Sequence, residues 1–113
     1  MTDSLVSWCK QNNMYVILDL QAAPGGQGGT TGLSGYNPAY PSLWESNLNK
    51  NKTFSLWRKI AEHYQNEPAI AGYDYLNEVN WNLGNNELRN FYMQLTDSVR
   101  SVDQNHIIFI EGN

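Results

Sequence analysis

The sequence predicts an α/β protein in which helices alternate with the strands of a parallel sheet. Three apolar runs have the length of strands, at residues 14–20, 69–76 and 106–110, and an amphipathic segment of helical length precedes each of them. Such alternation is typical of parallel strands joined by right-handed crossovers. The runs are almost continuously apolar, as expected of parallel strands that are covered on both faces.

The first helix is predicted over residues 3–11, where Leu5, Trp8 and Cys9 share one stripe. The first strand, over residues 14–20, follows directly. Cys9 is the only cysteine, so an internal disulfide is impossible, and we expect it to be a buried thiol.

A glycine-rich loop is predicted over residues 21–40. The dinucleotide-binding fingerprint needs glycine at three positions; Gly26 and Gly28 supply the first two, but Thr31 stands at the third. A small nucleotide-binding domain is therefore disfavoured. Loops of this length in compact domains are usually functional or disordered, and we expect a mobile loop on the substrate side.

Two longer helices complete the alternation. The first is expected to start near Asn51 or Thr53 and to end near Gln65, because the residue before Pro68 leaves the helical region. It carries a stripe of apolar side chains at helical spacing. The second is predicted over residues 86–102, between the second and third strands.

The composition excludes several kinds of partner. The chain has 7 Lys and Arg against 11 Asp and Glu, a net charge of −4, and phosphate binding needs clustered cations. We therefore expect no nucleic acid and no membrane surface as a partner, and no apolar run is long enough to span a bilayer. His63 and His106 are not spaced with other ligands, so no metal site is predicted.

The pair Asn77-Glu78, at the end of the strand over residues 69–76, is the strongest sign of chemistry. The carboxyl ends of parallel strands form the face at which such sheets bind ligands. Partial burial there would raise the pKa of Glu78 and keep a proton available for a departing glycosidic oxygen. Asn77 is suited to hydrogen-bond a sugar hydroxyl. Asp19 and Asp74 interrupt apolar strands, and structural hydrogen bonding is the better interpretation of both.

A resemblance to a known family covers nearly the whole chain, in order and with suitable spacing. It is carried by residues 66–78 (NEPAIAGYDYLNE), by residues 15–20 with the APGG that follows, and by residues 106–113. These stretches resemble the fourth, third and fifth strand regions of glycoside hydrolase family 5, the large cellulase family. The Asn-Glu pair alone is shared by a wider clan of retaining glycosidases, and the flanking sequence narrows the resemblance to family 5.

The resemblance implies a partial (β/α)8 TIM barrel, with residues 1–113 as a single, incomplete segment spanning strands three to five. It implies retaining hydrolysis of O-glycosidic bonds in a β-glucan, with Glu78 as general acid/base and Asn77 contacting the sugar. A polysaccharide or oligosaccharide would be the substrate, and no metal or organic cofactor is implied. The parent enzyme would be extracellular or periplasmic, although this chain shows no signal peptide and begins at once with a helix, like an excised segment.

One departure concerns the substrate-binding face. Gln21 stands where the family usually has His; it keeps the capacity to hydrogen-bond a sugar but cannot become a cation. Aromatic side chains that could stack on sugars follow at Trp81 and Trp44, with core packing as the alternative for Trp44. Tyr36 and Tyr40, from the loop, are weaker candidates.

The length of the chain leaves a second possibility open. Retaining chemistry needs two carboxyl groups about 5–5.5 Å apart, and the nucleophile of the family is a Glu on the seventh strand, which this segment lacks. Glu111 could approach Glu78 from the neighbouring strand, but it does not occupy the nucleophile position. The alternative is a catalytically inactive barrel fragment that binds sugar weakly or self-associates through its open sheet edges.

Overall fold

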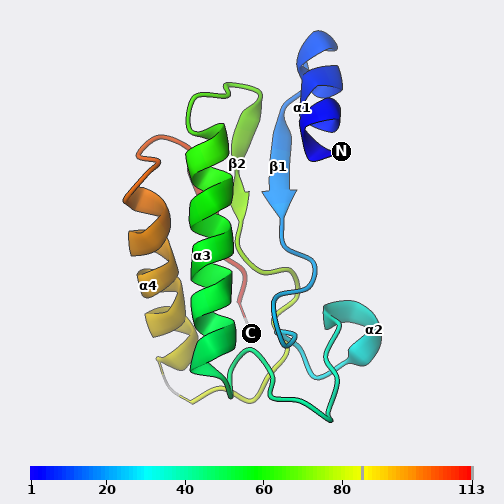
Figure 1. The fold of residues 1–113 in the computed structure, drawn as a ribbon, viewed down its shortest axis with the longest axis vertical. Coiled ribbons are helices and arrows are strands. Elements are labelled where there is room, and N and C mark those ends of the chain that lie inside the picture. The colour runs from blue at the N-terminus through cyan, green and yellow to red at the C-terminus, as the bar shows by residue number, and fades with distance from the viewer. Residues whose placement is uncertain (85, 113) are drawn as a thin grey trace.

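The fold is an alternating series of helices and strands. A computed structural model describes residues 1–84 and 86–112 (Figure 1). The elements are, in chain order, α1 (Thr2–Gln11), β1 (Val16–Asp19), α2 (Thr31–Ser34), α3 (Asn47–Tyr64), β2 (Ile70–Asp74), α4 (Glu87–Arg100) and β3 (Ile107–Phe109). This order confirms the predicted α/β class and adds the short helix α2 inside the predicted loop.

The strands form one parallel sheet in the order β1-β2-β3, with β2 in the centre. Its register aligns three rows of residues, Ile17–Gly72–Ile107, Leu18–Tyr73–Ile108 and Asp19–Asp74–Phe109. A Cβ atom at Gly72 would come within 2.4 Å of the carbonyl oxygen of Ile107. The central strand therefore needs glycine at this point, where its neighbour passes closely.

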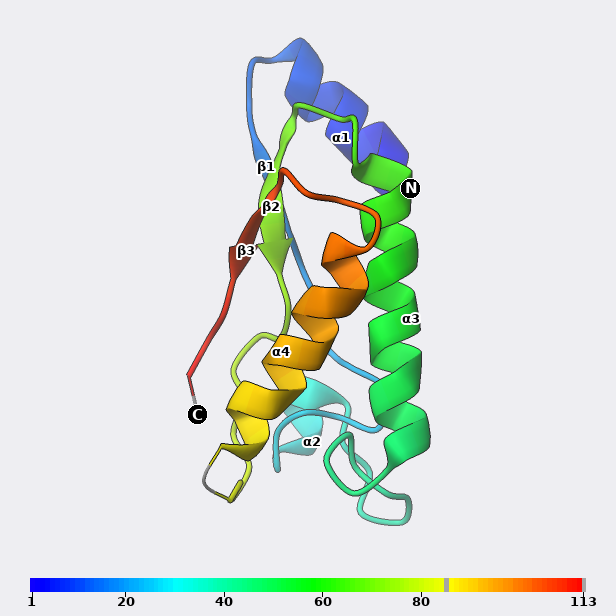
Figure 2. The same ribbon diagram turned by 90° about the vertical axis from the view of Figure 1, so that its left-hand side faces the viewer.

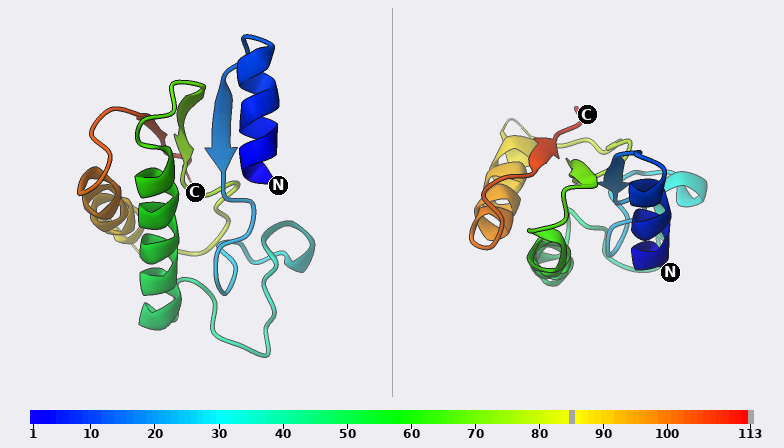
Figure 3. Two further views of the ribbon diagram at one scale, coloured as in Figure 1. Left: turned by 45° about the horizontal axis from the view of Figure 1, so that its top comes forward. Right: turned by 90° about the horizontal axis from the view of Figure 1, so that it is seen from above.

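Helices α3 and α4 pack on one face of the sheet (Figure 2), and α1 lies on the same side (Figure 3). The ring of Trp57 from α3 lies 5.7 Å from that of Tyr73 and 5.5 Å from that of Tyr75. Phe91 from α4 packs at 5.1 Å on Phe54 from α3. Aromatic side chains bury the largest apolar areas of any residue type, so this layer of rings fixes β2 against the helices.

No described element covers the opposite face of the sheet. Ile17 is 51% exposed, Ile107 57% and Phe109 36%. The prediction that the strands are covered on both faces is therefore wrong for this chain. In a closed barrel this face points inward, where side chains from the other strands fill the space.

Helix α3 begins at Asn47, earlier than the predicted start near Asn51 or Thr53. The Ser46 hydroxyl caps it by accepting a hydrogen bond from the N–H of Asn49, at 3.2 Å. Thr53 lies buried inside the helix, where its hydroxyl donates to the carbonyl of Asn49. The apolar stripe thus marks the part of α3 that packs on the sheet and not the residue at which the helix starts.

Helix α1 contacts the rest of the fold through a narrower stripe than predicted. Val6 is its buried residue, whereas Trp8 is 62% exposed. Cys9, expected to be buried, is half-buried and carries a free thiol. Neither α1 nor any other helix within the described ranges is long and apolar enough to cross a membrane.

A buried polar network lies at the amino end of β3. Asp103, 1% exposed, accepts hydrogen bonds from the Tyr73 hydroxyl at 2.7 Å and from the N–H groups of Asn105 and His106 at 2.9 and 3.2 Å. The Nδ1 atom of His106 lies 2.6 Å from the same carboxylate. Arg100 donates to the carbonyls of Asp103 and His106. His106 therefore has a structural position that ties β3 to β2 and α4.

Candidate active site

The carboxyl ends of the three strands meet at one rim of the sheet (Figure 2). Gln21 follows β1, Asn77 and Glu78 follow β2, and Glu111 follows β3. Parallel strands deliver the residues after their carboxyl ends to the same edge, which is where α/β sheets bind ligands. The structure thus brings most of the predicted site residues to one rim, and Trp81 lies in the loop that follows Glu78.

Glu78 has an unusual main-chain conformation. Its φ of +46° lies in the left-handed region. Among the described residues other than glycine, only Asn13 and Asn86 share this region. Asparagine tolerates this region because its short side chain can hydrogen-bond locally, but glutamate has no such preference. Strain of this kind costs about 1–3 kcal/mol and concentrates at functional sites. The Glu78 side chain is exposed, so the expected partial burial is wrong for this segment, whose sheet is open.

The main chain of Asn77 and Glu78 is held from three directions. The N–H of Asn77 donates to the carbonyl of Leu20 at 3.2 Å, and the Asn77 carbonyl accepts from Nε2 of Gln27 at 2.8 Å. The N–H of Glu78 donates to Oε2 of Glu111 at 2.6 Å. The backbone of the pair is thus tied to β1, to the glycine-rich loop and to the end of β3.

Gln27 organises the first half of the glycine-rich loop. It is 1% exposed; its Oε1 accepts from the N–H of Ala23 at 3.0 Å, and its Nε2 donates to the carbonyls of Gln21 and Asn77. Gly26 turns the chain at φ +80°, where a Cβ would meet Tyr36 within 2.7 Å. Residues 23–28 of the loop are buried or half-buried and held by these hydrogen bonds, and the mobility of the loop stays a prediction. No sequence pattern pointed to Gln27 beyond its place inside a run of glycines.

The rest of the loop contacts the chain beyond Glu78. Gly28 and Asn80 form an isolated parallel bridge, and the N–H of Gly29 donates to the Asn80 carbonyl at 2.8 Å. The ring of Tyr36 meets that of Trp81 edge to face, with centroids 5.0 Å apart. Trp81 is half-buried, so one part of the indole remains open at the rim.

Comparison with known proteins decides the family. The model of the family described as cellulase (glycosyl hydrolase family 5) matches residues 1–113. The chain belongs to glycosyl hydrolase family 5. Its strands and helices are therefore part of a (β/α)8 barrel, as the resemblance implied.

Similarity to individual glycosidases extends this comparison. The chain is 32% identical over 111 residues to a β-xylosidase of Phanerodontia chrysosporium, covering 98% of this chain and 23% of that protein. It is 31% identical over 113 residues to the probable glucan 1,3-β-glucosidase A of Aspergillus fumigatus, covering 96% and 26%. The Pseudomonas stutzeri endoglucanase Cel5A, solved in complex with cellobiose, matches with a TM-score of 0.70 at 27% identity, covering 96% and 29%. The chain thus spans 23% to 29% of the length of these relatives.

Trp44 is a core residue of this family 5 chain. It is 5% exposed, its ring lies 5.1 Å from that of Phe91, and its Nε1 donates to the carbonyl of Gln27 at 2.8 Å. The interpretation of Trp44 as a sugar platform is therefore wrong, and core packing, the alternative, is confirmed. Tyr40, by contrast, is 70% exposed.

Asp19, Asp74 and Glu111 place negative charge on the open side of the family 5 sheet. Burial, followed by the charge of Glu111, raises the pKa of Asp19 above its usual range. Burial likewise raises the pKa of Asp74, followed by the charges of Glu111 and Asp19. Oδ1 of Asp74 is buried without a hydrogen-bond partner among the residues that the structure describes. Within that part of the chain, no three or more His, Cys, Asp or Glu side chains are grouped to hold a metal ion.

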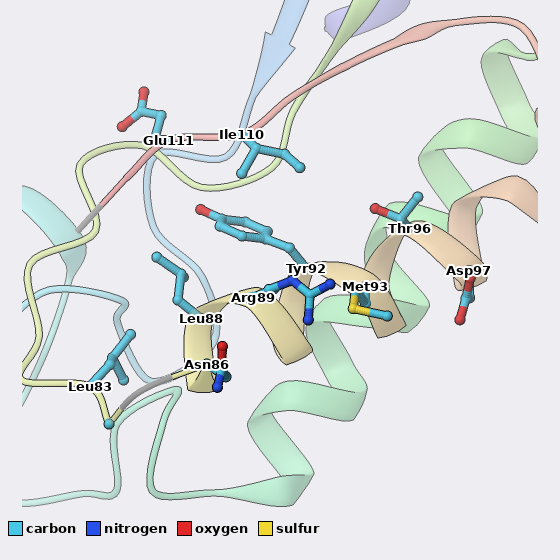
Figure 4. Close-up of a pocket in the computed structure, with 11 residues that line it drawn as sticks. Leu83, Asn86, Leu88, Arg89, Tyr92, Met93, Thr96, Asp97, Ile110 and Glu111 are labelled. Carbon is cyan, nitrogen blue, oxygen red and sulfur yellow. The ribbon is translucent and has the colours of Figure 1, made fainter.

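A cavity of about 610 Å³ lies between α4 and the end of β3 (Figure 4). Tyr92, Met93 and Ile110 contribute to its apolar wall, and Glu111 reaches it from the rim. The pair Asn77-Glu78 does not line it. In a (β/α)8 barrel the helices stand side by side in an outer ring, so the cavity occupies the flank of α4 and not the substrate rim.

Proposed function

We propose that this chain supplies the general acid/base part of a retaining β-glycosidase. The observation that supports the proposal is the position of Asn77-Glu78 in a family 5 chain: the pair follows β2 at the carboxyl rim, with its main chain held and the Glu78 side chain exposed. An exposed carboxyl on a fixed backbone can reach a bound substrate without moving the sheet.

In the first step, the protonated Glu78 donates its proton to the glycosidic oxygen as the bond to the anomeric carbon breaks. A second carboxylate attacks that carbon and forms a glycosyl-enzyme. In the second step, the Glu78 carboxylate takes a proton from a water molecule that attacks the same carbon and releases the sugar. We assign the second carboxylate to a strand outside residues 1–113, since Glu111 is engaged with the main chain of Glu78.

Three side chains are proposed to hold the substrate at the rim. The Asn77 amide would hydrogen-bond a sugar hydroxyl beside the scissile bond, and Gln21 would do so from the end of β1. Trp81 would stack on a sugar ring, with Tyr36 against its edge. The relatives are named as a β-xylosidase, a probable glucan 1,3-β-glucosidase and an endoglucanase, and we propose a β-glucan polymer or oligomer as the substrate of this chain. Such polymers lie outside cells, so we propose an extracellular or periplasmic location.

Reducing-sugar release from a soluble β-glucan tests the proposal. The polypeptide that carries this chain is compared with its Glu78→Gln variant, and loss of the acid/base is expected to lower activity by about 100-fold or more. Glu62→Gln is the matched control, because Glu62 is an exposed glutamate on α3 and should leave activity unchanged. Equal activity of Glu78→Gln and the unchanged protein would reject the acid/base assignment.

A second function is favoured by the open sheet face. Ile17, Ile107 and Phe109 are exposed there. Among residues 1–84 and 86–112, no further strand pairs with the outer edges of β1 and β3, and such edges invite pairing with another copy. The 113-residue chain on its own would then bind sugar weakly or self-associate without catalysis. Cellobiose binding by calorimetry, with no sugar release from glucan, would support this function over the first.

A further inference from the structure

We infer that Gln27 and Glu111 are positioning residues for Glu78: together they hold its main chain in the left-handed conformation and so fix the direction of its carboxyl group. The inference rests on the proposed acid/base role of Glu78. It adds two residues that are not proposed to touch the substrate.

Two hydrogen bonds hold the main chain between Asn77 and Glu78. The Asn77 carbonyl is held by Gln27 at 2.8 Å, and the N–H of Glu78 by Glu111 at 2.6 Å. These two groups belong to the same peptide unit, the one that links Asn77 to Glu78. Fixing both its oxygen and its nitrogen fixes the plane of that peptide, which is one of the two planes that define the φ of Glu78. The bridge between Gly28 and Asn80 holds the chain on the other side of Glu78.

Gln27 supplies the hydrogen-bond donors that the carbonyl side of this peptide needs. A primary amide offers two N–H donors and a carbonyl acceptor, and the structure uses all of them. The donors go to the carbonyls of Gln21 and Asn77, and the oxygen accepts from the N–H of Ala23. One buried side chain thus links the chain after β1 to the chain after β2. A glutamate of the same shape would offer no donor when ionised and one donor when protonated, so it could not serve both carbonyls.

Glu111 has to supply only an acceptor. Its Oε2 takes the Glu78 N–H, while the charged groups near it on the sheet, Asp19 and Asp74, are themselves acids. An amide oxygen at position 111 would accept the same hydrogen bond. A catalytic carboxylate at this position would instead need its charge. The two roles therefore differ in what Glu111→Gln does.

Steady-state kinetics of the polypeptide that carries this chain, on a soluble β-glucan, separates the roles. Glu111→Ala and Gln27→Glu are expected to lower kcat by about 10- to 100-fold with little change in KM, because a displacement of about 1 Å at the reacting group has effects of that size. Glu111→Gln should keep most of kcat. Ser42→Ala is the control: Ser42 is also buried, between α2 and α3, and donates to Glu45 at 2.7 Å, so its loss should lower stability but not kcat.

The outcomes are distinct. Loss of activity in Glu111→Gln as large as in Glu111→Ala would overturn the inference, as would normal kcat in Gln27→Glu. If Glu78→Gln is inactive while Glu111→Ala is normal, the positioning role fails and the proposed function stands. If Glu78→Gln itself keeps activity, the proposed function fails.

Amide exchange provides a measurement that does not depend on activity. In the 113-residue polypeptide, the Glu78 N–H should exchange slowly in the unchanged protein and in Glu111→Gln, and much faster in Glu111→Ala, because only the last lacks an acceptor at this position. Equal exchange rates in the unchanged protein and Glu111→Ala would overturn the inference even in a chain that releases no sugar.

Discussion

The indole N–H of Trp57 donates a hydrogen bond to the main-chain carbonyl of Tyr75, at 3.0 Å. Trp57 is 1% exposed and comes from the middle of α3, whereas Tyr75 directly follows the last residue of β2. Strand β2 ends at Asp74, and α3 adds to the support that main-chain hydrogen bonds from Tyr75 to Phe109 and from Asn77 to Leu20 give the chain beyond it. The position of the site residues therefore depends on helix packing as well as on the sheet.

Trp57→Phe should destabilise the protein strongly. The substitution removes the donor, leaves the buried carbonyl of Tyr75 unpaired and opens a gap beside its ring. These losses together are expected to lower the free energy of unfolding by about 2–4 kcal/mol. Urea denaturation measures it. Trp8→Phe serves as the control, because Trp8 is 62% exposed and its change should stay within about 0.5 kcal/mol. Similar losses in both variants would contradict the prediction.

Asp103 should make the protein sensitive to acid. Burial alone would raise the pKa of this carboxyl, but hydrogen bonds from the Asn105 N–H, the Tyr73 hydroxyl and His106 outweigh burial and lower its pKa from 3.8 to about 2. A depressed pKa means that the folded state favours the ionised form. The contribution to stability, about 2 kcal/mol, is present above pH 4 and is lost as the pH falls through 2.

The Asp103→Asn variant tests this pH dependence. It should be less stable by about 2 kcal/mol at pH 7 and should lose less stability than the unchanged protein between pH 4 and pH 2. Denaturant unfolding at a series of pH values measures both. Asp97→Asn, an exposed position on α4, should leave the pH curve unchanged. Parallel curves for the unchanged protein and Asp103→Asn would refute the role of Asp103.

The order of elements and the rim position of Glu78 were accessible from the sequence because both depend on local patterns. Apolar runs of strand length between amphipathic segments predict the sheet, and a polar pair at the end of such a run predicts the rim. The start of α3 was missed because Ser46 caps a first turn that carries no apolar stripe. Periodicity reports packing, and a helix can extend beyond the part that packs.

The contact of Gln27 could not be predicted from the sequence, whereas the approach of Glu111 to Glu78 was predicted and is confirmed at 2.6 Å. Glu111 and Glu78 follow strands of one parallel sheet, whose carboxyl ends share a rim. Gln27 meets Asn77 across 50 positions of chain through a loop that folds back, and no short-range pattern records that contact. Trp44 is a residue that the sequence offered as a candidate for sugar binding and the structure places in the core. Its indole packs on Phe91 and donates to the carbonyl of Gln27.

Trp81→Leu should weaken sugar binding at the rim. The indole provides a flat apolar face, and its replacement is expected to lower the affinity for cellobiose about tenfold, or about 1.4 kcal/mol. Calorimetric titration of the polypeptide with cellobiose measures this change. Tyr36→Leu should have a smaller effect in the same direction, because Tyr36 supports the ring edge. Trp8→Leu, on the exposed side of α1, should bind cellobiose normally; unchanged binding by Trp81→Leu would remove Trp81 from the site.

Self-association of the 113-residue polypeptide through its open sheet face should depend on both apolar contact and charge. Ile107 is 57% exposed on the edge strand β3, and a lysine there would have to be desolvated in any pairing. Ile107→Lys is therefore expected to shift the mass measured by light scattering from dimer toward monomer, whereas Leu48→Lys, equally exposed on α3, should not.

Because the pKa values of Asp19 and Asp74 are raised, more of these carboxyls are protonated as the pH falls from 7 toward 4. Repulsion between two copies then decreases and association should strengthen. The measurement uses protein at about 100 µM, roughly the range at which weak contacts form. If the protein is a monomer at every pH under these conditions, the exposed face does not bind a second copy.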